Sequence, residues 1–190
     1  ADDYPALPEL GDMAISATFP SPILLSGINN TIYATAEDEI RPVMNGIFFD
    51  MTPESTTLVA TDSHKLVYYT RNDVKAAEKC SFILPKKPAA ILRTLLGKSD
   101  DIVKVTFDMK NAYFEFEGNI LICRLQEGTY PAYRSVIPKN NPNKLVISRV
   151  QLLNAVKRVA VCSNQSTSHV KLSLSFNKLV ISASDTNFSM

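Results

Sequence analysis

The sequence has few of the features that point to a specific chemistry. Its 190 residues include only six glycines and no phosphate-binding loop of the G-x-x-x-x-G-K type. The three cysteines, Cys80, Cys123 and Cys162, form no C-x-x-C pair, which argues against a zinc site or a disulfide framework and fits a reducing cytoplasm. Long uncharged stretches are broken by proline, asparagine or serine, so we expect no segment to span a membrane.

The chain also lacks a strong charge of either sign. Its net charge is +1, which neither favours nor excludes a nucleic-acid partner. With 45% hydrophobic and 21% charged residues, the composition is that of a globular protein. An argument for nucleic-acid binding must therefore rest on where the charges lie.

An internal repeat is the most informative feature that is present. Three landmarks return in the same order after 126, 128 and 123 residues. The pairs are Tyr4-Pro5-Ala6 with Tyr130-Pro131-Ala132, Leu24-Leu25 with Leu152-Leu153, and LVATDS (58–63) with ISASDT (181–186). Three matches in register predict a duplicated domain whose second copy is incomplete, so we expect the chain to be part of a longer protein.

A finer repeat divides the first copy into two modules, each a strand, a helix and three strands. Hydrophobic periodicity predicts these elements. The first module has a strand near 13–19, a helix at 22–36 that Ser21 caps, and strands at 43–51, 56–60 and 65–70. The second has a strand at 80–84, a helix with Ile91, Leu92, Leu95 and Leu96 inward, and strands at 103–109, 112–117 and 119–125.

A third module begins after a proline-rich connector. We predict a strand at 144–147, a helix capped by Ser148, and a strand near 170–176. The residues predicted to face inward from this helix are Leu152, Leu153, Val156, Val159 and Ala160.

Candidate catalytic chemistry is confined to one short motif. His64 lies two residues after Asp62, and such a pair can act as a general base in a hydrolase or lyase. The alternative is that Asp62-Ser63 forms a turn and that His64 is a surface residue. We expect no metal site and no cofactor, because the remaining histidine and the cysteines show no ligand spacing.

Basic residues gather on two of the predicted helices. Lys86, Lys87 and Arg93 lie on or beside the second helix, and Lys157 and Arg158 lie on the third. Basic helices on a common scaffold could face the phosphates of DNA without reading its sequence. The alternative is that these residues only solubilise outer helical faces.

Several motifs together resemble the family of bacterial DNA polymerase III beta subunits, the sliding clamps. The resemblance runs through nearly the whole chain, and "ATDSHKL" with "YPAYRSVIP" at this separation is specific. The motifs are DDYPALP (2–8), RPVMNGIFFD (41–50), LVATDSHKL (58–66), ILPKK (83–87) and GTYPAYRSVIPKNNP (128–142).

The resemblance implies an α+β DNA-clamp fold in which each domain is a doubled strand-helix-three-strand module, with two helices backed by antiparallel sheets. Residues 1–12 would then be a connector from a missing first domain, and 13–127 the middle clamp domain. Residues 128–143 would connect it to the first half of the last domain, 144–190. Two full-length subunits of the family close into a homodimeric ring around duplex DNA.

The resemblance also implies a pocket for partner peptides. Its residues here would be Arg41, Met44, Thr61, Ser63, His64, Lys65, Leu66, Pro131, Ser135 and Val136. Ser63 stands where the family frequently has glycine, and Lys65 and Ser135 stand where it frequently has arginine. Lys86 and Lys87 fit the family's basic DNA-facing lining, to which helical position adds Arg93, Lys157 and Arg158.

The implied function is a non-catalytic processivity factor in the bacterial cytoplasm, associated with the nucleoid. Its partners would be duplex DNA and the peptide motifs of polymerase and clamp-loader subunits. Two other interpretations stay open: a hydrolase or lyase that uses Asp62 and His64, and a protein-interaction module that does not bind DNA.

Overall fold

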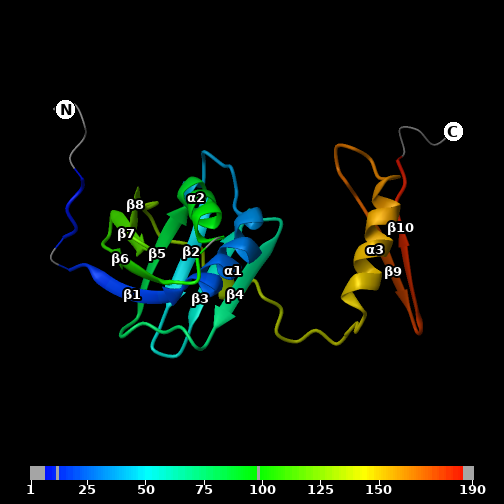
Figure 1. Ribbon diagram of the computed structural model, residues 1–190. Helices are drawn as coiled ribbons and strands as arrows, with labels where there is room; N and C mark the ends of the chain where they lie inside the picture. Colours follow the sequence, from blue (N-terminus) through cyan, green and yellow to red (C-terminus); the bar gives the residue numbers. More distant parts are fainter. Residues whose placement is uncertain (1–6, 12, 98, 186–190) are drawn as a thin grey trace. The chain divides into compact units, whose positions relative to one another are not determined.

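The computed structural model describes residues 7–11, 13–97 and 99–185 of the chain (Figure 1). Most of the predicted connector 1–12, including Tyr4-Pro5-Ala6, therefore lies outside the described residues, as does the end of the ISASDT motif. The chain divides into two compact units, residues 1–137 and 138–190. Among the described residues, none of the helices has the length and apolar character needed to cross a membrane.

The first unit contains two modules of the predicted order, which confirms the doubled strand-helix-three-strand pattern. Short 3-10 turns at Ile32–Ala34 and Pro42–Met44 follow the first helix. The first module is β1 (Ile15–Pro20), α1 (Ser21–Thr31), β2 (Gly46–Met51), β3 (Thr56–Thr61) and β4 (Leu66–Arg71). The second is β5 (Cys80–Pro85), α2 (Lys86–Leu96), β6 (Ile102–Phe107), β7 (Asn111–Phe116) and β8 (Asn119–Arg124).

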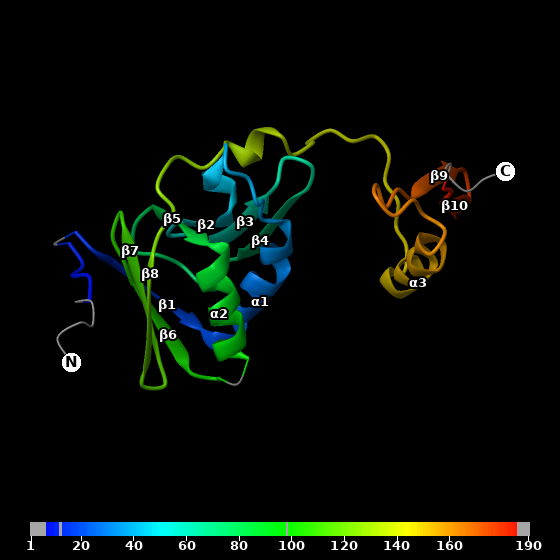
Figure 2. The same cartoon turned by 90° about the horizontal axis from the view of Figure 1, so that it is seen from above.

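The two modules exchange their first strands. The sheets are antiparallel, with the orders β4-β3-β2-β5 and β1-β6-β7-β8. β1 thus joins the sheet of the second module, and β5 joins the sheet of the first. The helices α1 and α2 lie side by side in both views and pack against each other (Figures 1 and 2). The sequence repeat predicts the modules but gives no sign of this exchange.

The helices bury narrower faces than the sequence predicts. On α2, Leu92 and Leu96 are buried, whereas Ile91 and Leu95 are each 42% exposed, so the prediction that these two face inward is wrong. The physical reason is the helical period, which places Ala89, Leu92 and Leu96 on one stripe and turns Ile91 and Leu95 away from it.

The first helix also differs from its prediction at both ends. It begins at Ser21, which is the first helical residue and not the cap, and Pro20 occupies the cap position. The buried Ser21 Oγ lies 3.2 Å from the Ser99 Oγ. The helix ends at Thr31, well before residue 36. At this end the Thr31 hydroxyl donates a hydrogen bond to the Gly27 carbonyl at 2.7 Å.

Aromatic side chains join the two sheets into one core. The Phe49 and Phe82 rings stack with centroids 4.5 Å apart, and Phe107 lies 4.5 Å from Phe82. Phe19 meets Phe49 edge to face at 6.3 Å. These residues come from β1, β2, β5 and β6, so the core depends on both modules being present.

The second unit contains α3 (Arg149–Ala160) and a hairpin of β9 (Lys171–Ser175) and β10 (Lys178–Ser182). The predicted cap is confirmed, because the Ser148 Oγ accepts a hydrogen bond from the Gln151 amide at 3.5 Å. The predicted strand at 144–147 is wrong: these residues form no strand within the described part of the chain.

The helix α3 differs most from its prediction. None of its residues is buried, although five were predicted to face inward. Leu153 and Ala160 are exposed, and Leu152, Val156 and Val159 are only half-buried. Within unit 2 the helix packs against one hairpin alone, which is too little structure to cover an apolar helical face.

Candidate binding site

A rigid turn between β3 and β4 forms the centre of the candidate site. The Asp62 carboxylate accepts hydrogen bonds from the backbone amides of His64 (3.0 Å) and Lys65 (2.9 Å), and it also pairs with the Lys65 ammonium. The bonds from Lys65, followed by that from His64, hold the pKa of Asp62 well below its usual range. Asp62 therefore acts as a turn former, and His64 meets it through the backbone, not the imidazole.

Ser63 adopts a backbone conformation that is rare for a residue with a side chain. Its φ is +77°, in the left-handed region that favours glycine. The Ser63 amide donates to Thr61 Oγ1 at 3.1 Å, and the Thr61 hydroxyl donates to the Lys65 carbonyl at 2.7 Å. These bonds fix the turn despite the cost of this conformation.

Arg41 links the turn to the segment that follows α1. Its Nη1 donates to Ser63 Oγ at 2.6 Å, and its Nε donates to Asp38 Oδ2 at 3.0 Å. The Ser63 hydroxyl lies 3.5 Å from the Met44 sulfur. The structure thus brings Arg41, Met44 and Ser63 together. Met44 is buried, so little of its side chain is open to a partner.

The segment 130–137 is fastened to the outer face of β2. The Tyr130 ring stacks on Phe48 with centroids 4.7 Å apart and planes 4° from parallel. The Tyr133 hydroxyl donates to Asp50 Oδ2 at 2.8 Å, and Arg134 Nη2 donates to the same oxygen at 3.0 Å. Burial raises the pKa of Tyr130 to about 12 and also raises that of Tyr133.

The sequence motifs did not predict these anchoring contacts, although the same segment carries the Tyr-Pro-Ala repeat and part of the family resemblance. The signal that could have found them is the spacing of Tyr130 and Tyr133. Two tyrosines three residues apart in a proline-containing segment can both lie against one sheet face. Phe48 and Asp50, two residues apart on β2, provide that face, because alternate side chains of a strand point the same way.

Leu66 joins the turn to the anchored segment. It is half-buried and packs against an apolar cluster formed by Val59, Ile83, Tyr130 and Tyr133. Its cross-strand partner is Thr61, so both side chains lie on the face of the sheet opposite the main core. Leu66, a predicted pocket residue, thus lies against the anchored segment on this face of the sheet.

The other predicted residues of this site lie on the anchored segment. Pro131 is half-buried, and Ser135 is exposed with its hydroxyl donating to the Ala132 carbonyl at 2.7 Å. Val136, which follows the 3-10 turn Tyr133–Ser135, is 67% exposed. On the β3–β4 turn, His64 and Lys65 are both exposed.

A cavity of about 640 Å³ lies on the other side of the turn. It is bordered by Arg41, Asp62, His64, Lys86 and the acidic segment 37–39. Lys86 Nζ pairs with Glu37 Oε1 at 2.6 Å across this space, and the ion pair lowers the pKa of Glu37. No sequence motif predicts this acidic border.

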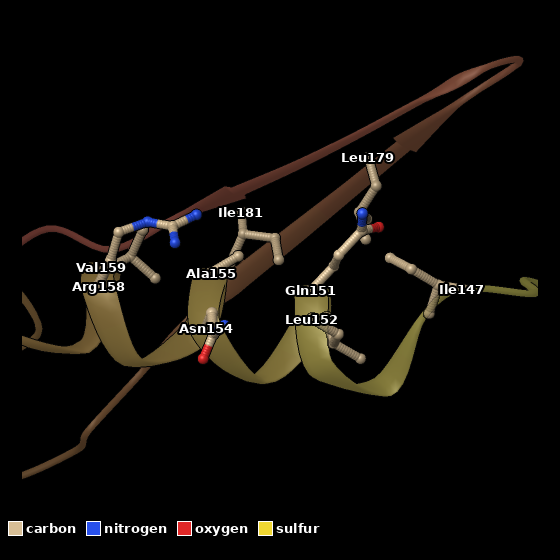
Figure 3. A pocket seen from close by; sticks show the side chains of 9 residues that line it. All are labelled: Ile147, Gln151, Leu152, Asn154, Ala155, Arg158, Val159, Leu179 and Ile181. Carbon is tan, nitrogen blue, oxygen red and sulfur yellow. The ribbon is translucent and has the colours of Figure 1, made fainter.

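The predicted DNA-facing residues differ in their surroundings. Lys86 is paired with Glu37, whereas Lys87 and Arg93 are exposed on α2. In the second unit Lys157 and Arg158 are both exposed on α3. Arg158 also lines a groove between α3 and the hairpin (Figure 3).

Comparison with known families and proteins gives a consistent result along the chain. Residues 18–132 match the central domain of the DNA polymerase III beta subunit, and residues 134–189 match its C-terminal domain. The beta sliding clamp of Escherichia coli is 29% identical over 185 residues, covering 97% of this chain and 50% of the relative. That of Synechococcus elongatus is 27% identical over 179 residues, covering 92% and 47%.

Solved structures of sliding clamps have the same fold as this chain. A Pseudomonas aeruginosa DNA polymerase sliding clamp has a TM-score of 0.92 at 25% identity, covering all of this chain and 52% of that protein. The sliding clamp of Bacillus subtilis has a TM-score of 0.88 at 24% identity, covering 98% and 50%. The chain spans about half the length of the relatives it matches. By its matched domains and its α+β clamp fold, the chain belongs to the family of bacterial DNA polymerase III beta subunits.

Proposed function

We propose that this chain is part of a sliding clamp, a non-catalytic subunit that encircles duplex DNA as a ring and tethers the replicative polymerase. Residues 13–127 would form the middle domain, 128–143 the connector and 144–190 the first half of the last domain. The full-length protein would act as a homodimer in the bacterial cytoplasm, at the nucleoid. Membership of the family and the geometry around Ser63 support this proposal.

The observation that carries the proposal is the joining of the β3–β4 turn to the anchored segment through Leu66. Short peptide motifs of polymerase and clamp-loader subunits need apolar contacts and a few fixed polar groups. Leu66, Pro131 and Val136 offer the apolar contacts, and Arg41 and His64 offer the polar groups. Because hydrogen bonds already hold the turn, little conformational entropy is lost on binding.

DNA binding would be weak and independent of sequence. Lys87 and Arg93 on α2, with Lys157 and Arg158 on α3, are exposed cations that can approach phosphates. Lys86 contributes less, since Glu37 already neutralises it. A ring retains DNA by its topology, so strong local affinity is not required, and this agrees with a net charge of +1.

The experiment is a titration of the chain with a short extended peptide that contains one glutamine and two leucines, followed by NMR or calorimetry. We expect affinity between roughly micromolar and millimolar, because the interface is small. Leu66→Lys places a charge at the apolar rim and should abolish binding, and Val136→Glu should weaken it at least tenfold. Val136 is exposed, so its replacement does not endanger the fold.

Two controls separate the proposal from its alternatives. Ile120→Lys changes an equally exposed apolar residue on β8 and should leave binding unchanged. Asp62→Asn should also leave binding largely intact, because Asp62 is a turn former. Binding that survives both Leu66→Lys and Val136→Glu would contradict the pocket, and a hydrolytic activity that Asp62→Asn removes would favour the enzyme.

A further inference from the structure

The face of β2 that points away from the main core carries one charged residue. Ile47, Phe49 and Met51 belong to the main core, so Phe48 and Asp50 point to the other face of the sheet. Strand pairing places each of these two residues in a row of four side chains across the sheet. The apolar row is Ile83, Phe48, Val59 and Tyr68, and the polar row is Ser81, Asp50, Thr57 and Thr70.

The segment 130–137 is attached to this face at three points. The attachments are Tyr130 on Phe48, Tyr133 with Arg134 on Asp50, and Ile137 on the apolar cluster. The proposed peptide-binding residues of the segment lie between these points. Pro131 follows the first attachment, and Ser135 and Val136 lie between the second and the third. Their position therefore depends on how firmly the three attachments hold.

The attachment at Asp50 is a closed triangle of hydrogen bonds. The Tyr133 hydroxyl donates to Asp50 Oδ2 at 2.8 Å, and Arg134 Nη2 donates to the same oxygen at 3.0 Å. Arg134 Nε also donates to the Tyr133 hydroxyl at 3.0 Å. The Asp50 side chain is only 12% exposed. Because an almost buried carboxylate is costly to leave without donors, this triangle favours the attached conformation.

The remaining backbone bonds of the segment are local. The Ser135 amide donates to the Ala132 carbonyl at 3.0 Å, and the Val136 amide donates to the Tyr133 carbonyl at 3.3 Å. These bonds shape the 3-10 turn but do not fix its place on the sheet. Stacking and apolar packing at the ends of the segment tolerate sliding better than hydrogen bonds do. The directional part of the attachment is thus concentrated on Asp50.

We propose that Asp50 is a positioning residue of the peptide site. It holds the segment 130–137 in one place on β2 and so keeps Pro131, Ser135 and Val136 ready for a peptide. Asp50 would not touch the peptide itself, because its carboxylate is almost buried and already bonded. The inference rests on the proposed function and adds a residue that regulates its affinity.

The proposal predicts how the affinity is lost when Asp50 is removed. A segment that is in place for only a fraction of the time lowers the apparent affinity by that fraction. The association rate constant falls with it, whereas the dissociation rate constant of the formed complex does not change. A residue that contacts the peptide directly would instead change the dissociation rate constant.

NMR titration of the 190-residue chain with the glutamine- and leucine-containing peptide tests this, because line shapes give both rate constants. Asp50→Ala should raise the dissociation constant about tenfold or more, through slower association. Asp50→Asn keeps an acceptor oxygen for Tyr133 and should stay within about threefold of the parent. Tyr133→Phe keeps the ring but removes one donor, and should raise the constant about threefold.

The matched control is Tyr130→Phe, the same replacement three residues earlier. The Tyr130 hydroxyl is buried and has no hydrogen-bond partner among the described residues, so the affinity should stay within about twofold. Hydrogen exchange of the free proteins gives a second measurement. In Asp50→Ala the amides of Ser135 and Val136 should exchange about tenfold faster than in the parent, while those of β3 keep their protection.

Three results would overturn the inference. The first is a parent that binds the peptide while Asp50→Ala binds it equally well. The second is equal weakening by Tyr133→Phe and Tyr130→Phe. The third is a loss of affinity that lies in the dissociation rate constant alone. If Asp50→Ala loses protection throughout the sheet, Tyr133→Phe decides, and unchanged affinity in that variant overturns the inference.

The failure of the proposed function has a different signature. A parent chain that does not bind the peptide at all would contradict the proposed function and, with it, this inference. In the three results above the parent still binds, and only the role of Asp50 fails.

Discussion

The two units contain the same kind of module in different surroundings, and the contrast shows what stabilises the fold. Leu24 in α1 and Leu152 in α3 are counterparts in the repeat and occupy the same helical position, yet Leu24 is buried and Leu152 is half-exposed. Each helix has one hairpin beside it. In the first unit β4 of the same module also packs on α1, and the second module supplies α2 and the strand β5; neither has a counterpart among the described residues of the second unit. A clamp module thus specifies its elements locally but completes its core only with a partner module.

The largest expected effect compares Leu24→Ala with Leu152→Ala. Removing a fully buried leucine should lower the free energy of unfolding of the first unit by about 2 to 5 kcal/mol, because it leaves a cavity. The same change at Leu152 should cost less than about 1 kcal/mol, since water already reaches this side chain. Both changes place alanine inside a helix, so the difference in helix propensity cancels.

Chemical denaturation, with probes that report each unit separately and at concentrations where the chain is monomeric, measures both costs. Equal costs for the two variants would mean that α3 is as well buried in solution as α1. The contrast between the units would then be wrong.

The second prediction compares the cationic helices of the two units in binding to linear duplex DNA. Affinity should fall steeply with salt and show no preference for sequence. Replacing Lys87 and Arg93 by alanine should weaken binding severalfold and reduce the salt slope by about 1 for each phosphate that is no longer neutralised. Replacing Lys157 and Arg158 should act similarly. Fluorescence anisotropy over a salt series measures the slope.

The control for DNA binding is Lys75→Ala, which removes an exposed cation from the loop after β4. It should leave the salt slope unchanged. Tight binding that resists salt, or that prefers one sequence, would contradict phosphate neutralisation as the basis of affinity.

A smaller effect is expected at the β3–β4 turn. Asp62→Ala removes the acceptor for two backbone amides and should destabilise the first unit by about 1 kcal/mol. Because the pKa of Asp62 is lowered on folding, its stabilising contribution is complete above the ordinary carboxyl pKa. It is lost as the pH falls from that value through the lower pKa of the folded state. Denaturation of parent and variant from neutral pH downward should show their stabilities converging in acid.

Asp62→Asn is the matched variant for this turn. The amide oxygen still accepts from the backbone, and only the charge opposite Lys65 is removed. Its cost should be smaller than that of Asp62→Ala and should depend little on pH. An equal cost for both variants would show that the ion pair, not the turn, carries the effect.

The smallest effect is expected for Ser63→Gly. Glycine relieves the left-handed conformation but removes the hydroxyl that accepts from Arg41. The two contributions oppose each other, each about 1 kcal/mol, so stability should change by less than about 0.5 kcal/mol. Ser63→Val should be clearly destabilising, because a β-branched residue tolerates this φ poorly. Thermal unfolding of the three proteins measures the order.

The sequence predicts local features well and their assembly poorly. The alternation of apolar and polar residues predicts β6, in which Val103, Val105 and Phe107 are buried. The internal repeat predicts the order of the elements in both modules. Met109, the next residue in that alternation, lies beyond the end of the strand and is exposed. The exchange of β1 and β5 between sheets is invisible in sequence, because periodicity describes a strand and not its neighbours.

The candidate site was predicted only in part for the same reason. Resemblance located Ser63, Leu66 and Val136, and turn chemistry assigned Asp62 its role. The anchoring of the segment 130–137 by Phe48 and Asp50 depends on contacts between residues more than 80 positions apart, which one sequence does not reveal. The predicted strand at 144–147 failed for a related reason: its residues suit a strand, but a strand needs a partner.

Hydrogen exchange measured by mass spectrometry tests most directly the claim that a module needs a second module. At low micromolar concentration, the amides of β2 and β3 should exchange slowly, at a rate that does not change with concentration. The amides of β9 and β10 should exchange at least a hundredfold faster, because no second module covers them within the described residues. Equal protection of β2 and β9 at low concentration would contradict the account.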